Sequence, residues 1–259
     1  MNDIKTPPPT EKLLEKEGRD IRRMFASIAP RYDLLNRVLS LGFDKRWRER
    51  AVELSELSEL PEDAKDVRVL DVCTGTADLA IAYSQKIGSR GRVIGSDFCW
   101  EMLALAPKKL NALRENFSNV TLVQADALHL PFPDNSFHVA SVAFGIRNVS
   151  NLEEGIREMT RVIRPGGMVV ILEFGLPENR VFKGAYNLYF NQVLPRVGNF
   201  ISSVGSSAGL RAYTYLPASV GKFPDARGMR ELMESLGLTG VASHPLTFGI
   251  ANIHIGKKP

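Results

Sequence analysis

The chain has 259 residues, of which 44% are hydrophobic and 24% are charged, and its formal net charge is +4. This length and composition predict a folded chain with a substantial core and exclude a mainly disordered protein. The sequence has no apolar run of the roughly 18 residues that span a bilayer, no signal segment and only two cysteines, so we expect a reducing, cytoplasmic setting.

The N-terminal part of the chain is expected to be helical. Residues 1–10 contain three consecutive prolines and are expected to lack fixed structure, whereas residues 11–62 are expected to form a helical cap. The cap precedes a main domain over 63–259. Its first helix, over 11–28, would carry one apolar face made of Ile21, Met24, Phe25 and Ile28, and a third helix begins near Trp47.

Basic residues are concentrated between residues 19 and 50. This segment holds nine lysines and arginines against four acidic residues. Such a surface suits anionic lipid, nucleic acid or an anionic ligand, although from composition alone a solvated helix face is the favoured interpretation. No RNA-binding signature accompanies it, so we expect no nucleic-acid partner.

From Val67 onward, apolar segments alternate with helical ones, which is typical of a mostly parallel, doubly wound α/β sheet. The expected strands cover 67–72, 93–96, 120–124, 138–142 and 168–173, and the expected helices cover 78–87, 100–115 and 152–163. Pro107 predicts a kink or a late start in the second of these helices. Pro165, Gly166 and Gly167 are expected to end the third.

The stretch from about 176 to 220 breaks this alternation. It is rich in aromatic residues and poor in charge, and we expect an amphipathic helical insertion. A closing helix over 225–236 follows, and then two strands over 242–246 and 250–255. A hairpin at the end of a parallel sheet would add an antiparallel edge strand.

The turn after the first strand suits a ligand-binding site. Asp71, Gly75 and Thr76 lie there; glycine permits a sharp turn and close ligand approach, and the next helix offers free N–H groups. Asp97 follows the second strand, where an acidic side chain can accept both ribose hydroxyls of an adenosine. The three-glycine dinucleotide fingerprint and a P-loop lysine are absent, which disfavours a nicotinamide oxidoreductase. S-adenosylmethionine, an adenosine with an amino-acid arm, fits better.

Each candidate has an alternative role. Asp71 can hold an ammonium group directly or through water, or it can simply cap the turn. Asp97 can be an ordinary loop residue, although its position favours ligand binding. Asp126, at the end of the third strand, can accept from the adenine amine or form an Asx turn. The four histidines show no ligand spacing, so no metal site is expected.

Several longer stretches occur together: Phe25-x-x-Ile28-Ala29-x-Arg31-Tyr32-Asp33, Leu130 to Phe137, Phe144 to Val149, Arg161 to Gly167, and Leu172-Glu173-Phe174. The Pro-Gly-Gly and Leu-Pro-Phe elements are common to many class I methyltransferases. The other stretches are more specific, above all Tyr32-Asp33 and Phe144 to Val149. Together they resemble the ubiquinone/menaquinone biosynthesis C-methyltransferases over nearly the whole chain from about Met24.

The resemblance implies a class I, Rossmann-like fold with a seven-stranded, mostly parallel sheet and an antiparallel edge strand. It implies S-adenosylmethionine as cofactor and methylation of a ring carbon on a polyprenylated quinol. It places Thr76, Asp97, Asp126 and Ala127 at the cofactor. The family loop usually has a second glycine where this chain has Ala77, which is tolerable if φ is negative there.

Quinol methylation needs a group that stabilises a phenolate and aligns it with the sulfonium methyl. Arg147 and Asn148 follow the fourth strand, at the edge where open sheets bind ligands, so we expect oxyanion stabilisation by Arg147 and hydroxyl orientation by Asn148. The alternatives are a surface ion pair for Arg147 and a helix N-cap for Asn148. Tyr32, in the cap, is expected to close over the cofactor, with core packing as its alternative.

We therefore expect an enzyme that methylates a polyprenyl quinol. Two alternatives stay open: a methyltransferase acting on another lipid-like or phenolic molecule, and a non-catalytic cofactor-binding subunit of a quinone-synthesis assembly. Because the substrate is lipid-soluble, we expect peripheral contact with the inner membrane through the basic region and the aromatic insertion. The sequence does not distinguish a naphthoquinol from a benzoquinol, and it leaves homo-oligomerisation open.

Overall fold

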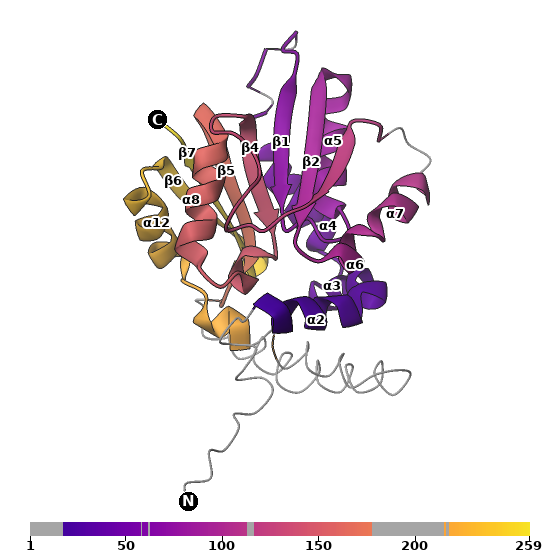
Figure 1. The fold of residues 1–259 in the computed structure, drawn as a ribbon. Helices are drawn as coiled ribbons and strands as arrows, with labels where there is room; N and C mark the ends of the chain where they lie inside the picture. Colours follow the sequence, from indigo (N-terminus) through magenta and orange to yellow (C-terminus); the bar gives the residue numbers. More distant parts are fainter. Residues whose placement is uncertain (1–17, 58, 62, 113–116, 178–214, 216–217) are drawn as a thin grey trace, which may run out of the picture.

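A seven-stranded sheet organises the computed structural model, which describes residues 18–57, 59–61, 63–112, 117–177, 215 and 218–259. The strand order is β3-β2-β1-β4-β5-β7-β6, and β7 runs antiparallel to both of its neighbours (Figure 1). The strands are β1 (Val67–Val72), β2 (Gly91–Asp97), β3 (Val120–Gln124), β4 (Phe137–Ala143), β5 (Ile163–Phe174), β6 (Thr239–Leu246) and β7 (Ala251–Lys257). The expected mostly parallel sheet with an antiparallel edge is confirmed.

The described α-helices are α2 (Gly18–Ile28), α3 (Tyr32–Leu39), α4 (Asp44–Glu53), α5 (Asp78–Ile87), α6 (Trp100–Leu103), α7 (Ala106–Ala112), α8 (Leu152–Val162) and α12 (Ala226–Ser235). Short 3-10 turns are η1 (Ala29–Arg31), η2 (Gly88–Arg90), η3 (Ile146–Asn148) and η5 (Thr247–Gly249). Residues 1–10 and most of the expected insertion over 176–220 lie outside the described residues. Among the described helices, none is long and apolar enough to cross a membrane.

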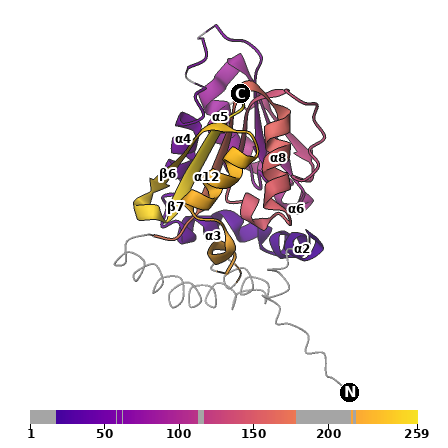
Figure 2. The same cartoon turned by 90° about the vertical axis from the view of Figure 1, so that its left-hand side faces the viewer.

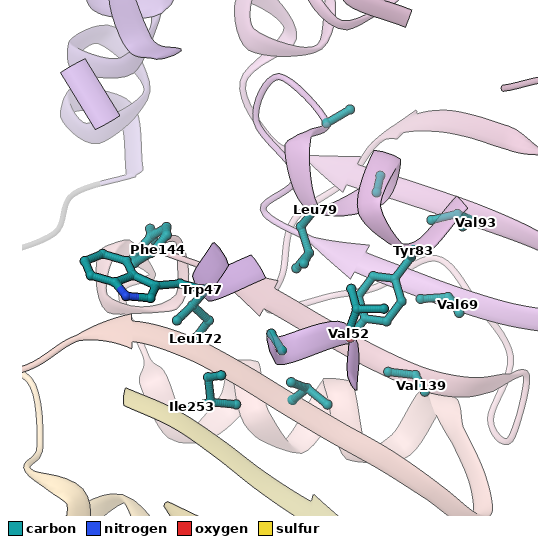
Figure 3. Close-up of a cluster of buried hydrophobic side chains, with 14 of the residues drawn as sticks. Trp47, Val52, Val69, Leu79, Tyr83, Val93, Val139, Phe144, Leu172 and Ile253 are labelled. Atoms are coloured by element: carbon teal, nitrogen blue, oxygen red, sulfur yellow. The ribbon is translucent and has the colours of Figure 1, made fainter. Parts of the chain in front are cut away.

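Helices cover both faces of the sheet (Figures 1 and 2). α4 and α5 pack on one face, and α8 and α12 pack on the other. Successive strand residues point to opposite faces. In β1, Val69 therefore joins the cluster under α4 and α5 (Figure 3), while Leu70 joins the cluster under α8 and α12. Burial on both faces explains why the strands are nearly continuous apolar runs.

The N-terminal helices are in contact with the sheet. α2 and α3 lie across the carboxyl ends of the strands, at the lower edge in Figure 1, and α4 packs beside α5. Trp47 in α4 donates from Nε1 to Thr247 Oγ1 at 2.9 Å, and its ring lies 6.1 Å from that of Phe144. The N-terminal segment thus shares the main core, and a domain boundary at residue 62 stays a prediction.

One expected helix and the start of one expected strand differ from the structure. The expected helix over 100–115 is divided into α6 and α7, with Pro107 as the second residue of α7, where its missing N–H costs no hydrogen bond. α8 ends at Val162, within one residue of the expected end, but the next strand, expected from residue 168, begins at Ile163 and runs through Pro165–Gly167. Gly166 N donates to Lys258 O at 2.8 Å, and Lys258 N donates to Gly167 O at 2.9 Å. Pairing with the distant C-terminus therefore extends this strand.

A close approach of two loops makes Gly145 sensitive to substitution. A Cβ on Gly145 would lie 2.4 Å from Cβ of Cys73, and Cys73 and Phe144 both have positive φ. We expect Gly145→Ala to lower the free energy of unfolding by about 1–3 kcal/mol, because overpacking costs this much. Urea unfolding checks this, with Gly221→Ala as the control because nothing lies within 4 Å of its Cβ position. Unchanged stability of Gly145→Ala would contradict the clash, whereas added Cys73→Gly should restore part of the loss.

Candidate active site

An open cavity lies at the carboxyl ends of the strands. The loops after β1, β2, β3 and β4 line one side of it, with Cys73, Gly75, Asp97, Asp126, Ala127, Gly145 and Asn148. Helix α2 and the start of α3 line the other side with Gly18, Ile21, Phe25 and Tyr32, which we call the α2–α3 wall. This is the edge at which open α/β sheets bind ligands.

Asp71 is a fully buried carboxylate at the end of β1. Thr74 Oγ1 donates to its Oδ2, while its Oδ1 has no hydrogen-bond partner among the described residues. Burial raises the pKa of Asp71 to about 7, against the hydrogen bond from Thr74. A buried acceptor without a donor is costly, so this oxygen is suited to a ligand ammonium group or a bound water. Asp71 is not among the residues that line the cavity, and its bond from Thr74 lies within the turn, so both of its expected roles stay predictions.

Asp97 ends β2 and is held by the backbone. Gly75 N donates to Oδ2 and Cys99 N donates to Oδ1, both at 2.8 Å. Burial raises the pKa of Asp97 to about 6, against these two bonds. Each carboxylate oxygen can accept two hydrogen bonds, so one position on each remains for a ligand. The side chain lines the cavity, as an adenosine-binding carboxylate must.

The turn after β1 is conformationally strained. Gly75 has φ +58, and a Cβ there would lie 3.6 Å from Tyr32 Cε1. Ala77 has φ +70, so the negative φ on which its tolerance was expected to depend is absent. A left-handed conformation costs a non-glycine residue about 1–2 kcal/mol. The Ala77 N–H donates to Thr74 O at 2.9 Å, which supports this conformation.

Thr76 follows Gly75 but its side chain points away from the cavity-lining set. Its hydroxyl donates to Asp33 Oδ1 at 2.6 Å and accepts from Lys109 Nζ at 3.2 Å. Asp126 and Ala127 do line the cavity. Asp126 Oδ1 accepts from Leu128 N at 3.0 Å, which is an Asx turn, so its two expected roles are compatible.

Arg147 forms a buried ion pair with Glu173, so a surface ion pair is wrong as its alternative role. Its Nη1 lies 2.6 Å from Glu173 Oε1 and donates to Phe144 O at 2.6 Å. The guanidinium carbon lies 5.5 Å from the ring centroid of Phe174, and Nε has no partner among the described residues. Burial raises the pKa of Glu173, although Arg147 opposes that shift.

Asn148 lies beside this pair and faces the cavity. Its Oδ1 accepts from the Tyr215 hydroxyl at 3.1 Å. The N-cap of α8 is Asn151, whose side chain accepts from Glu154 N, so an N-cap role for Asn148 is wrong. Tyr32 packs edge-on against Phe25, with ring centroids 6.1 Å apart, and burial raises its pKa. Tyr32 is therefore part of both the apolar packing and the cavity wall.

Sequence reasoning underestimated some neighbours of the site. Glu173 and Tyr215 hold Arg147 and Asn148 in the structure, and these long-range contacts are not indicated by any local sequence pattern. The helical spacing of Ile21 and Phe25 marked an apolar face, but it did not indicate that this face covers a cavity. No pattern marked Lys109. Within the described part of the chain, no cluster of side chains suited to a metal ion occurs.

Comparison with known proteins adds an independent result. Residues 12–258 match the model of the ubiE/COQ5 methyltransferase family. The chain is 43% identical to the ubiquinone/menaquinone biosynthesis C-methyltransferase UbiE of Geobacter sulfurreducens, over 99% of this chain and 95% of that protein. It is 44% identical to the demethylmenaquinone methyltransferases of Deinococcus radiodurans, over 97% of each chain, and of Thermus thermophilus, over 91% and 100%.

Solved structures support the fold. A possible histamine N-methyltransferase from Thermotoga maritima matches with a TM-score of 0.60 at 18% identity, over 92% of this chain and 99% of that one. The phosphoethanolamine N-methyltransferase 2 of Haemonchus contortus, in complex with S-adenosyl-L-methionine, matches with a TM-score of 0.54 at 17% identity, over 80% and 52%. With a family model matched over nearly its full length, the chain belongs to the ubiE/COQ5 methyltransferase family, as an S-adenosylmethionine-dependent C-methyltransferase.

Proposed function

We propose that the chain methylates a ring carbon of a polyprenylated quinol, converting demethylmenaquinol to menaquinol, carrying out the equivalent ubiquinone-pathway step, or both. The family and the names of the relatives support this acceptor class. The structural observation that carries it furthest is the buried Arg147–Glu173 pair, which lies directly behind Asn148. Asn148 lines the cavity, whereas Arg147 and Glu173 are not among the lining residues. A fixed cation in an apolar surrounding is what a phenolate intermediate requires.

The cofactor supplies an electrophilic methyl group when it is bound. On the protein side, the partnerless Asp71 Oδ1 would accept from its ammonium group, and the remaining lone pairs of Asp97 would accept from the ribose hydroxyls. Asp126 and Ala127, which line the cavity, would contact the adenine. Gly75 and Thr76 contribute through the shape of their turn, since the Thr76 hydroxyl already donates to Asp33.

The acceptor carbon becomes nucleophilic when the neighbouring ring hydroxyl gives its proton to water, and after methyl transfer that carbon gives its own proton to water, which restores the aromatic ring. Arg147 stabilises the resulting oxyanion rather than acting as a base, because a guanidinium is not deprotonated in proteins. Glu173 fixes the orientation of Arg147, Asn148 orients the hydroxyl, and Tyr32 covers the ring. Charge is neutralised as the methyl group moves, so the buried and largely apolar surroundings of these groups favour the step.

Cofactor affinity is expected to rise with pH. The pKa values of Asp97 and Asp71 are raised to about 6 and about 7, so both carboxyls ionise only as pH passes through this range. Because an ionised Asp71 is needed to hold an ammonium group, S-adenosylmethionine should bind about tenfold more tightly at pH 8 than at pH 6. Isothermal calorimetry measures this. Asp71→Asn should bind weakly with a flatter pH dependence, whereas Asp134→Asn, on the surface, should behave as the unaltered protein. A pH-independent affinity would contradict the assignment.

The role of Arg147 is tested by Arg147→Lys, which keeps the charge but not the planar fork. We expect kcat to fall about 100-fold, while affinity for S-adenosylhomocysteine stays within about twofold. Transfer of labelled methyl groups to demethylated naphthoquinol and benzoquinol acceptors in mixed micelles gives turnover, and calorimetry gives affinity. Arg157→Lys, in an exposed ion pair on α8, is the control. Unchanged turnover would contradict the role of Arg147. If the unaltered protein binds the cofactor but methylates neither acceptor, the proposed function is wrong.

We further propose peripheral contact with an anionic bilayer through two turns. Leu41, before α4, and Phe248, in η5, are 66% and 67% exposed and have φ of +52 and +60. A strained backbone that displays a large apolar side chain points to a functional use. Phe43 stacks on Trp47, and Trp47 donates to Thr247, so the two turns are adjacent. Exposed Arg37, Lys45 and Arg46 flank the first turn and suit anionic headgroups.

Combined Leu41→Asn and Phe248→Asn should weaken binding to vesicles of anionic phospholipid by about tenfold, because two apolar contacts are lost. Thermal stability should be retained, since asparagine tolerates positive φ. Vesicle co-sedimentation at low salt measures the binding. Asp66→Asn, another exposed residue with positive φ, is the control at the opposite edge of the sheet. Equal binding by the doubly substituted and unaltered proteins would count against this surface.

A further inference from the structure

A charged cluster joins the α2–α3 wall to the turn after β1. Lys109 Nζ, on α7, lies 2.8 Å from Asp33 Oδ2 and 3.2 Å from Thr76 Oγ1, and it also contacts Asp78 Oδ1. The Thr76 hydroxyl donates to Asp33 Oδ1 at 2.6 Å. Asp33 belongs to α3, Thr76 to the glycine turn and Asp78 to the first turn of α5. One ammonium group on α7 therefore contacts α3 and the turn that runs from Gly75 into α5, two segments that are distant in sequence.

The cluster continues into the protein. Asp78 Oδ2 lies 3.1 Å from Arg48 Nη2, and Arg48 Nη1 lies 2.7 Å from Asp44 Oδ2. Arg48 and Asp44 are buried, and Ser40 adds a hydrogen bond to Asp44. The inner end of this chain of ion pairs is thus fixed by burial, while Lys109 and Asp33 at its outer end are partly exposed. The outer end is the part that can exchange with water.

Asp33 is well placed to hold the wall in position. The preceding residue is Tyr32, whose ring covers the Gly75 turn and contacts Phe25 of α2. The cavity lies between this wall and the carboxylates of Asp97 and Asp126. A contact that stabilises the closed position of the wall makes it harder for a ligand to leave the cavity. Such a contact therefore raises the affinity for the ligand and slows its release.

We infer that Lys109 is a positioning residue, whose ammonium group holds the α2–α3 wall against the glycine turn. By stabilising this closed arrangement, Lys109 raises the affinity for the cofactor and lengthens its residence time. Lys109 touches neither cavity nor reacting atoms. The inference depends on cofactor binding, which the family establishes, and is independent of the identity of the acceptor. It also gives the Thr76 hydroxyl a role, as the link between the turn and Asp33.

The test replaces Lys109 by methionine, which keeps the stem and removes the charge. We expect S-adenosylhomocysteine to bind about five- to tenfold more weakly and to dissociate faster, as partly exposed ion pairs are individually modest. The KM for the cofactor should rise while kcat at saturation stays within about twofold. Lys108→Met, the exposed neighbour on α7, removes the same charge without the contacts and should change little.

The salt dependence of cofactor affinity distinguishes loss of an ion pair from altered packing, because salt screens charges and not apolar contacts. Affinity of the unaltered protein should fall between about 20 mM and about 500 mM NaCl, because exposed ion pairs are screened, and affinity of Lys109→Met should be flatter. Thr76→Val, which loses the link to Asp33, should repeat the faster release, and Lys109→Arg should restore affinity in part. Equal affinities and equal salt dependence of Lys109→Met and Lys108→Met would overturn the inference. If Lys109→Met has a lowered melting temperature, Asp33→Asn and Thr76→Val take its place. Release of S-adenosylhomocysteine from both variants at the rate of the unaltered protein would then overturn the inference.

Discussion

The burial of charge at one edge of an otherwise apolar sheet is the constraint on which the site depends. Asp71 and Glu173 are fully buried, and Asp97 and Arg147 are 7% exposed. Isolated charges in such positions cost several kcal/mol or lose their charge, so each needs compensation. Glu173 has Arg147, and Asp97 has two backbone N–H donors. Asp71 has one hydroxyl donor and one oxygen without a partner. The incomplete compensation of Asp71 is where ligand binding has most to contribute.

The backbone around these groups is shaped by the same requirement. Cys73, Ala77 and Phe144 have positive φ, and Gly145 packs against Cys73 so closely that no Cβ fits. These turns follow β1 and β4, which are neighbours in the sheet. Strain in adjacent turns brings Asn148 and the glycine turn to one cavity. The turns persist because the strands beneath them are held by two buried cores.

Local sequence predicted the central elements well. The strands at 67–72 and 120–124 and the helix at 78–87 have the expected bounds, because short apolar runs between glycine or aspartate turns are unambiguous. Asp97 lines the cavity, as expected for the end of a parallel strand at this edge, whereas Asp71 is buried behind the lining residues. The strand through Pro165–Gly167 was missed, because its pairing with Lys258 is a long-range contact that overrides local turn signals. The positive φ of Ala77 was also missed, because alanine disfavours this conformation and its presence in the sequence therefore does not predict it.

The N-terminal helices illustrate why fold and function need different kinds of evidence. Their amphipathic spacing identifies a buried face, but the spacing is the same whether that face covers a sheet or a ligand. In the structure, α4 covers the sheet, with Trp47 packed on Phe144 and Phe174. By contrast, α2 covers the cavity, with Ile21 and Phe25 in its wall. α3 connects the two helices and carries Tyr32 and Asp33. α3 therefore joins the cavity wall to the ion pairs of α4, and Trp47 connects α4 to η5 through Thr247. The cavity wall and the exposed turns thus belong to one connected set of helices.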